Sequence, residues 1–363
     1  MSHALTLKAI STKVVSVPLR RPVKSKIGVF EKWPLILIDL HTEEGVTGHS
    51  YLEPYLEKSA RYIVPALQDL AEARKGQSLA PMQDWQADRK RLNLVGLSGV
   101  TMIAASGLDM AAWDALAKSA GQPLARYLGG RTGAVPAYNS NGLWLQSPSG
   151  LGDEAKELVA EGDFSALKLR LGNDRVADDL EAIARIREAV GESIELMVDF
   201  NQGRTLGGAI ERCQALDDQG LSWFEEPVVY DDYRSYAELR RRMKTPLQIG
   251  ENFYGPRDMH RAIAEGACDF VMPDMMRIGG VTGWLRSAPI AAAAGVQIST
   301  HLYPEISAHL LCVTEGAHWL EWQDWADPIL EQPFELKAGQ LVVPDRPGIG
   351  ISWNRQAVDR YSI

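Results

Sequence analysis

The sequence has few cysteines: three among 363 residues, Cys213, Cys268 and Cys312. Three thiols do not make a paired disulfide framework, which favours a reducing compartment. We interpret each one as a small apolar core residue rather than a catalytic thiol. The first ten residues, MSHALTLKAI, also lack the basic and apolar regions of a secretory signal peptide. We therefore expect a cytoplasmic protein.

Long hydrophobic runs and an excess of positive charge are absent too. The longest apolar run, SAPIAAAAGVQIST at 287–300, contains a proline and a glycine and falls short of the ~18 residues that span a bilayer. The net charge of −9 argues against a general nucleic-acid role, although a locally basic site could still bind a small anion. The basic stretch ELRRRMK at 238–244 is typical of a solvated helix face. We expect neither a membrane nor a nucleic-acid partner.

The first 130 residues read as strands followed by helices. Segments 12–19, 34–42 and 45–52 are rich in β-branched and apolar residues and are separated by turn residues. Segments 56–76 and 98–122 carry apolar residues at helical spacing, and glycines follow the second of them. These features predict an α+β module.

From about residue 134, short apolar runs alternate with helical segments. Alternation of this kind predicts parallel βαβ units, and eight units within about 200 residues match a (β/α)₈ barrel. The eight runs occupy 135–142, 164–172, 194–201, 221–227, 246–252, 270–276, 295–301 and 317–323.

The last segment, 334–351, predicts a hairpin and a loop that pack back on the first module. The chain is accordingly divided into a capping domain at 1–131, a barrel at 132–330 and a tail at 331–363 that completes the capping domain.

Acidic residues stand at the ends of three consecutive runs. Asp199, Glu225 and Glu251 follow one another at intervals of 26 residues, one βα unit each. In such a barrel the chemistry lies at the carboxyl ends of the strands. Three neighbouring carboxylates repel one another, and a hard divalent cation relieves that repulsion. The pattern therefore predicts a Mg²⁺ site.

The next three runs end in Asp274, His301 and Glu321. A carboxylate that orients an imidazole makes a general base, so Asp274 and His301 are candidates for that role. Glu321 would lie opposite. If burial among anions keeps it protonated, it could donate a hydrogen bond to a substrate carboxyl group.

Lys168 and Arg170 alternate with leucines in the run SALKLRLG. On a strand their side chains point to the same face. Two cations on one face should not be buried without an anion as partner. A substrate carboxylate, or the enediolate formed from it, would be that anion.

Together these segments resemble the enolase superfamily, and within it the mandelate racemase subgroup. The resemblance spans essentially the whole chain. Its motifs are KLR (168–170), VDFNQ (198–202), WFEEP (223–227), GEN (250–252), MPDMMRIGGVTGW (272–284), STHLYPEISAHL (299–310) and HWLEW (318–322).

The resemblance implies an α+β capping domain and a modified (β/α)₇β barrel. It implies that Asp199, Glu225 and Glu251 bind Mg²⁺ and that Asp274 and His301 act as a base. It further implies that Lys168 lies near the substrate carboxylate and that Glu321 acts as an acid. Residues that would line the substrate site are Asn201, Ser140 and Tyr55. The subgroup also implies a homo-oligomer, often an octamer, and a small carboxylate substrate.

Arg170 departs from the subgroup's pattern, which has a second lysine there as the base on the opposite face. Arginine stays protonated, which disfavours a racemase with two bases. In the lid segment 21–33, Lys24, Ser25 and Lys26 suit a hydroxylated or doubly anionic substrate, although solvent-facing lysines fit equally well. We therefore expect an acid-sugar dehydratase, with a 2-hydroxyacid racemase or epimerase as the alternative. A metal-dependent hydrolase is disfavoured because it usually has histidine ligands, and a non-catalytic barrel because every motif residue is present.

Overall fold

Eight parallel strands form the central barrel that the sequence predicts. In this computed structural model, which describes residues 4–25 and 28–363, hydrogen bonds connect the strands in sequence order from β4 to β10, and β11 pairs with β4. A parallel bridge between Ile298 and Ala317 closes the ring. The strands are β4 (Ala134–Asn139), β5 (Ala166–Arg170), β6 (Glu195–Asp199), β7 (Phe224–Glu225), β8 (Leu247–Ile249), β9 (Phe270–Val271), β10 (Gln297–Ile298) and β11 (Leu320–Trp322).

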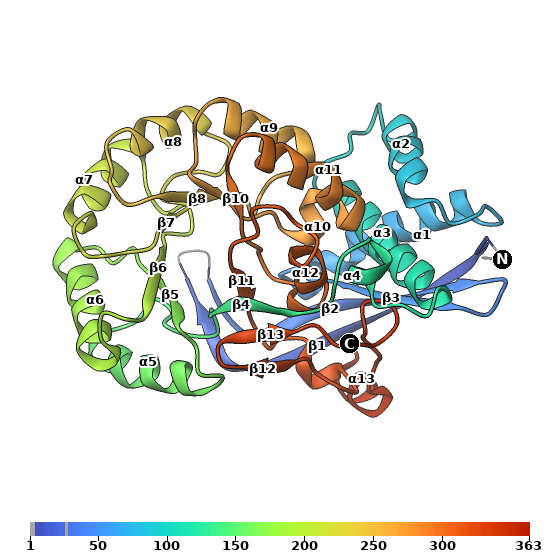
Figure 1. Ribbon diagram of the computed structural model, residues 1–363, viewed down its shortest axis with the longest axis horizontal. Helices are drawn as coiled ribbons and strands as arrows, with labels where there is room; N and C mark the ends of the chain where they lie inside the picture. Colours follow the sequence, from blue (N-terminus) through green and yellow to red (C-terminus); the bar gives the residue numbers. More distant parts are fainter. Residues whose placement is uncertain (1–3, 26–27) are drawn as a thin grey trace.

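Helices follow the first seven of these strands and surround the barrel (Figure 1). Only a short 3₁₀ helix, η3 (Asp327–Ile329), follows β11, so the barrel is of the (β/α)₇β type. The helices are α5 (Leu151–Ala160, preceded by η2, Pro148–Gly150), α6 (Val176–Val190), α7 (Leu206–Leu216), α8 (Tyr233–Arg240), α9 (Pro256–Ala264), α10 (Met275–Ile278), α11 (Gly280–Ala293) and α12 (Pro304–Leu311).

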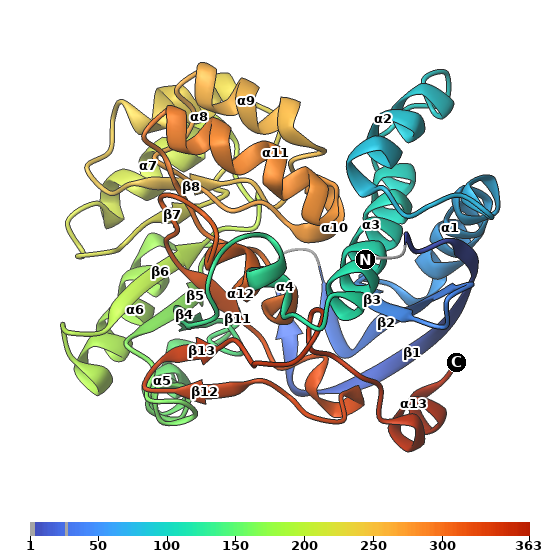
Figure 2. The ribbon, with the colours of Figure 1, turned by 45° about the vertical axis from the view of Figure 1, so that its right-hand side comes forward.

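The capping module is a three-stranded antiparallel sheet covered by helices (Figure 2). Gly48 lets the longest helix approach the sheet closely, because a Cβ there would lie 2.0 Å from the carbonyl oxygen of Ala111. The elements are β1 (Leu7–Lys24), β2 (Val29–Thr42), β3 (Thr47–Leu52), η1 (Glu57–Ser59), α1 (Ala60–Arg74), α2 (Pro81–Arg91), α3 (Val100–Ser119) and α4 (Leu124–Tyr127).

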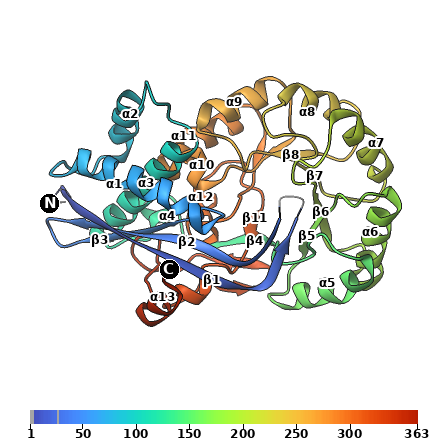
Figure 3. The same cartoon turned by 180° about the vertical axis from the view of Figure 1, so that it is seen from behind.

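The β1–β2 hairpin is longer than the sequence predicts, and the end of β1 and the start of β2 lie near β5 of the barrel (Figure 3). The amide of Leu145, in the loop after β4, donates to the carbonyl oxygen of Lys24 at 3.0 Å. This contact ties the end of β1 to the loop at the carboxyl end of β4. The segment expected to cover the substrate therefore belongs to a hairpin of the capping sheet.

The tail forms the expected hairpin, β12 (Glu335–Lys337) and β13 (Gln340–Val342). β13 pairs antiparallel with β4, so the hairpin extends the barrel sheet. The final helix, α13 (Arg355–Tyr361), lies against β1, where a bridge joins Val15 to Ser362. The tail thus contacts both modules.

No helix in the described part of the chain has both the length and the apolar character that a bilayer crossing requires. Cys213 and Cys268 are buried, and burial raises the pKa of each thiol to about 12. Both cysteines therefore behave as the small apolar core residues that the sequence analysis expects.

Candidate active site

Charged residues at the ends of the neighbouring strands β5, β6 and β7 lie side by side. In the parallel register Arg170 on β5 pairs with Asp199 on β6, and Asp199 pairs with Glu225 on β7. All five residues of β5 are buried, and Lys168 and Arg170 both line the cavity at the barrel mouth. Sequence alternation alone predicts this shared face, and the structure has it.

Lys168 is the cation between these acids. Its Nζ lies 2.6 Å from Glu321 Oε1, 2.9 Å from Glu225 Oε1 and 3.9 Å from Asp199 Oδ2. Burial lowers the pKa of Lys168, but the charges of Glu225 and Glu321 outweigh burial and raise it. The side chain is therefore a fixed positive charge at the centre of the site.

Asp199 on β6 and Glu225 on β7, the two carboxylates next to Lys168, both have a raised pKa. Burial is the main cause that raises the pKa of Asp199, and Lys168 and Arg170 oppose it. Burial likewise raises the pKa of Glu225 to about 7, with the charges of Asp199 and Glu251 adding to the effect. Like charges in a buried site gain stability when a cation is added.

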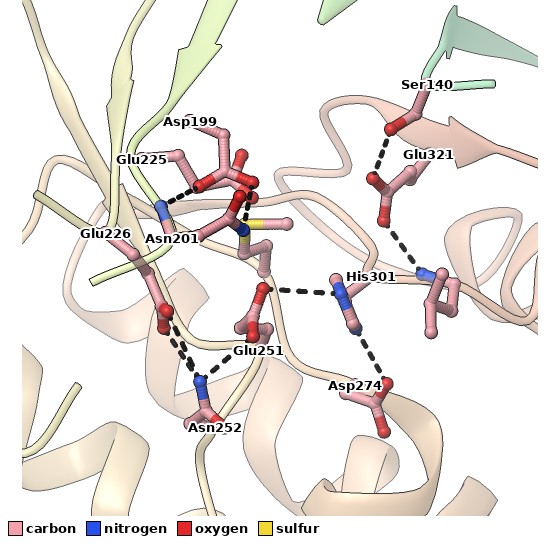
Figure 4. A network of polar contacts seen from close by, with 12 residues as sticks. Ser140, Asp199, Asn201, Glu225, Glu226, Glu251, Asn252, Asp274, His301 and Glu321 are labelled. Atoms are coloured by element: carbon pink, nitrogen blue, oxygen red, sulfur yellow. Dashed lines mark hydrogen bonds and ion pairs between the residues drawn. The ribbon is translucent and has the colours of Figure 1, made fainter. Parts of the chain in front are cut away.

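Glu251 lies just after β8 and contacts the histidine of the site, His301 (Figure 4). Its Oε2 is 3.3 Å from His301 Nε2, and its Oε1 accepts from Asn252 Nδ2 at 3.0 Å. Within the described ranges, no three His, Cys, Asp or Glu side chains already converge on one point at ligand distance. The set of three carboxylates, of which Asp199 and Glu225 are buried and Glu251 is partly exposed, nevertheless matches in its chemistry the all-oxygen ligands that Mg²⁺ prefers.

Asp274 and His301 form the pair that the sequence analysis expects. His301 Nδ1 lies 2.7 Å from Asp274 Oδ2, and the other carboxylate oxygen accepts the amides of Met276 and Arg277 at the start of α10. Burial lowers the pKa of His301, but Glu251 and the hydrogen bond to Asp274 raise it to about 9. Because Nδ1 faces Asp274, Nε2 is the nitrogen available for proton transfer.

Arg170 is locked in place by its neighbours. Its Nη2 donates to Ser140 Oγ at 2.7 Å and its Nη1 to the Ser140 carbonyl at 3.1 Å. The guanidinium also stacks over Trp144, with Cζ 4.1 Å from the ring centroid. These contacts hold the guanidinium in one orientation.

The structure corrects the protonation expected for Glu321. We expected burial among anions to keep this carboxyl neutral, but its near neighbours are cations. Burial raises its pKa, yet Lys168, His301 and Arg170 outweigh burial and lower it to about 2. Ser140 Oγ donates to Glu321 Oε1 at 2.7 Å. Glu321 is thus an ionised acceptor in this arrangement.

Most of these groups line one cavity of about 380 Å³ between the barrel mouth and the capping hairpin, although Glu225, Asp274 and Ser140 do not. Lys168, Arg170, Asp199, Asn201, Glu251, His301 and Glu321 line it, as does Tyr55 of the capping module. Asn201 donates to Asp199 Oδ2 at 2.9 Å. The hydroxyl of Ser140 accepts from Arg170 and donates to Glu321.

Lys24 is not among the cavity-lining residues. Its side chain is exposed and borders a separate surface groove, while the preceding residue, Val23, faces the cavity. Alternation along β1 explains this difference, because neighbouring side chains on a strand point to opposite faces. Lys26 lies outside the described residues. Of the polar lid that we expected, Ser25 lines the cavity, but so do the aromatic side chains of Phe30 and Trp33 from the same segment.

Sequence reasoning missed several buried polar residues of the site. Arg277 donates to the Glu251 carbonyl at 2.8 Å and stacks on Tyr55, and Glu226 accepts from Asn252 at 3.0 Å. Gln323 lies two residues beyond Glu321 and lines the same cavity. The period of two along a strand could have identified Gln323, but nothing local marks Arg277.

Family models match nearly the whole chain. The model "Mandelate racemase / muconate lactonizing enzyme, N-terminal domain" matches residues 9–129, and "Enolase C-terminal domain-like" matches residues 150–357.

Similar proteins share this architecture. An enolase from the alphaproteobacterium bal199, crystallised with magnesium, is 54% identical with a TM-score of 0.97, and the match covers 99% of this chain and 100% of that one. A Bradyrhizobium enolase complexed with magnesium and mandelic acid is 38% identical with a TM-score of 0.96, each chain being fully covered. The L-talarate/galactarate dehydratase of Salmonella typhimurium is 34% identical over 72% of this chain and 66% of its own length. The chain is therefore an enzyme of the enolase superfamily and belongs to its mandelate racemase/muconate lactonizing enzyme family.

Proposed function

We propose that this enzyme removes the proton α to a carboxylate with the help of Mg²⁺, and that it is an acid-sugar (2-hydroxyacid) dehydratase. The observation that carries the proposal is the Asp274–His301 pair beside Glu251, in one cavity with Lys168. Acid-sugar dehydratases are prominent among the curated relatives, which supports the choice of reaction.

Asp199, Glu225 and Glu251 would hold the metal. Their oxygen ligands suit a hard cation. The raised pKa of Asp199 and of Glu225 reflects the cost of burying negative charge, which a bound cation would offset. When bound, Mg²⁺ would polarise the substrate carboxylate and thereby acidify the α-proton. Two relatives crystallised with magnesium support this assignment.

The chain's own residues would carry out the proton transfers. His301 Nε2 takes the α-proton from C2, while Asp274 holds the ring and stabilises its positive charge. The electron pair of the C–H bond moves into the carboxylate, where Lys168 provides a fixed positive charge. The pair returns to form a C2–C3 double bond as the C3–O bond breaks. His301 returns its proton to the departing hydroxide as water, and the enol tautomerises to a 2-keto-3-deoxy acid.

Dehydration needs one base, and the cavity supplies one. Among the described lining residues, Lys168 is held charged between carboxylates, and Arg170 and Arg277 are guanidinium groups. Glu321, with a pKa lowered to about 2, is a weak base. We therefore assign the proton transfer to His301, whose pKa is raised to about 9 mainly by the neighbouring Glu251 and Asp274 carboxylates.

A 2-hydroxyacid racemase or epimerase is the second candidate. The aromatic side chains in the cavity wall and the relative crystallised with mandelic acid favour it. It requires a second base on the other face of the substrate, which the locked Arg170 does not provide. The homo-oligomer stays a prediction.

Proton NMR in D₂O with purified enzyme and Mg²⁺ distinguishes the candidates. Individual sugar acids and both mandelate enantiomers serve as substrates. A new deoxy-keto product would support the dehydratase, whereas α-proton exchange with inversion and no loss of hydroxyl would support the racemase. Absence of exchange from every substrate would count against both.

A further inference from the structure

Glu53 is a buried acid that the proposed reaction does not use. It follows β3 directly and is 3% exposed. Its Oε2 accepts the indole N–H of Trp33, on β2, at 2.6 Å. Its backbone amide donates to Tyr303 Oη at 2.8 Å. Tyr303 lies two residues after His301, so Glu53 contacts both the capping sheet and the barrel segment that carries the proposed base.

Trp33 is the shared neighbour of three other aromatic side chains that line the cavity. Its ring centroid lies 4.2 Å from that of Trp325, in the loop after β11. It lies 5.3 Å from the centroid of Tyr55 and 5.9 Å from that of Phe30, both in edge-to-face arrangement. These four side chains form the aromatic wall of the cavity. Because the other three rings pack on Trp33, its orientation sets the shape of the wall.

The hydrogen bond to Glu53 fixes the orientation of the Trp33 ring. Trp33 is 2% exposed, and a buried indole N–H needs an acceptor. Within the described residues that acceptor is Glu53 Oε2. An unpaired N–H in this place would carry a desolvation cost, so the ring would turn to pair with another acceptor or with water. Such a movement would shift the three rings that pack on it.

The side chain of Glu53 is protonated at neutral pH. Burial raises the pKa of Glu53 to about 8, although the hydrogen bond from Trp33 opposes the rise. A protonated carboxyl has one acceptor oxygen and one O–H donor, just as the amide of glutamine has one acceptor oxygen and a donor nitrogen. Glu53 therefore acts on Trp33 as a neutral hydrogen-bond acceptor, and glutamine should replace it in this role.

We propose that Glu53 is a positioning residue for substrate binding, which holds Trp33 and, through it, the aromatic wall in the arrangement that encloses the substrate. Glu53 is not among the cavity-lining residues, so it acts through Trp33 and touches neither the substrate nor the reacting atoms. The inference rests on the proposed function, because it takes this cavity as the substrate site. The wall contacts the substrate before and during the reaction alike, so a change in Glu53 should alter affinity more than the rate of proton transfer.

The indole N–H signal of Trp33 tests the contact without any substrate. NMR of the enzyme with isotope-labelled tryptophan and Mg²⁺ resolves the indole signals, and Trp33→Phe identifies the one that belongs to Trp33. We expect the same position and the same slow exchange with D₂O in the wild type and in Glu53→Gln. In Glu53→Leu, which removes the acceptor, the signal should shift and exchange rapidly. An unchanged signal in Glu53→Leu would overturn the positioning role.

Galactarate and mandelate, each with Mg²⁺, are the probes for binding by calorimetry and for α-proton exchange by proton NMR in D₂O. For the acid that the wild type binds more tightly, Glu53→Leu should lower the affinity about tenfold and exchange at saturation less than about threefold. Glu53→Gln should keep both within about twofold of the wild type. Unchanged affinity in Glu53→Leu, or a loss in Glu53→Gln as large as in Glu53→Leu, would overturn the proposal. Binding without exchange in the wild type would refute the proposed function and leave the affinity test intact. If neither acid binds, the indole signal decides the role of Glu53.

Trp33→Phe removes the same hydrogen bond from the other side, and it keeps the proposal testable if Glu53→Leu does not fold. It should also lower the affinity about tenfold, and the double variant should bind within about twofold of Glu53→Leu, because both residues act through one contact. Losses that multiply in the double variant would overturn the action of Glu53 through Trp33.

Trp113→Phe is the matched control for the loss of an indole hydrogen bond in the capping module. The indole of Trp113 donates to Thr282 Oγ1 at 2.9 Å, and Trp113 does not line the cavity. Its affinity for the same acid should stay within about twofold of the wild type, since the aromatic wall is untouched. An affinity loss in this control equal to that in Trp33→Phe would overturn the specific role of the Glu53–Trp33 contact.

Discussion

His301 and Asp274 lie on neighbouring strand ends, 27 residues apart in sequence, and are joined by a 2.7 Å contact between Nδ1 and Oδ2. Asp274 is completely buried, and its second oxygen caps α10. The contact therefore fixes both the ring orientation and the nitrogen that faces the cavity. This geometry allows the base to be tested separately from the metal ligands.

His301→Asn should reduce α-proton exchange by roughly 10²–10⁴-fold, because the proposed base is removed while the cavity keeps its shape. Proton NMR in D₂O measures the exchange. Calorimetry should give Mg²⁺ binding within twofold of the wild type, since the three carboxylates remain. Full exchange in this variant would refute the assignment of the base.

Asp199→Asn should abolish stabilisation of the protein by Mg²⁺. At a metal concentration 100 times the dissociation constant, wild-type stability should rise by about 2.7 kcal/mol. Thermal unfolding with and without Mg²⁺ measures this difference. Glu195→Gln, at the exposed start of β6, is the control and should respond as the wild type does. A wild-type response in Asp199→Asn would contradict the metal assignment.

Arg170→Met should weaken substrate binding more than it reduces exchange at saturating substrate. The reason is that Arg170 is locked by Ser140 and Trp144 and positions the substrate instead of moving a proton. We expect at least a tenfold loss of affinity, with saturated exchange reduced less. Arg185→Met, on the half-exposed face of α6, controls for loss of a charge. Loss of exchange with unchanged affinity would identify Arg170 as part of the proton-transfer machinery.

Glu53→Gln should remove a loss of stability that the wild type shows as the pH rises from about 4 to about 8. Burial raises the pKa of Glu53 to about 8, although the indole N–H of Trp33 donates to it and opposes the shift. The folded state therefore keeps a proton that the unfolded state releases above its ordinary pKa of about 4.3. The stability of the wild type relative to Glu53→Gln should fall between about pH 4 and pH 8, by at most about 1.4 kcal/mol per pH unit. Urea unfolding across this range would show parallel curves if the carboxyl is ionised in the folded state.

His309→Gln should have the opposite pH dependence. Burial lowers the pKa of His309 to about 4, and the ring contacts the Ala125 amide and the Ile349 carbonyl. The unfolded state therefore takes up a proton below about pH 6.5 that the folded state does not. The stability of the wild type relative to the variant should decrease as pH falls from about 6.5 to about 4. A difference independent of pH would mean that the folded protein accommodates the charged ring.

The eight barrel strands and the acids at their ends could be predicted because both are local properties of the chain. Period-two alternation places Lys168 and Arg170 on one face, and the regular length of the βα units places Asp199 and Glu225 on neighbouring strands. α2 was missed because few of its residues are apolar and few are buried, so it lacks a helical stripe. Its position depends on contacts with the rest of the capping module.

The barrel, the capping module, the candidate metal ligands and the departure at Arg170 follow from local patterns in the chain. The lowered pKa of Glu321, the exposure of Lys24 and the contact of Gln323 with Ser140 depend on how distant segments pack together. Local patterns fix which way a side chain points within its own element. The charge state of Glu321 depends instead on Lys168, from a strand distant in the sequence, and on burial in a cavity that two modules enclose.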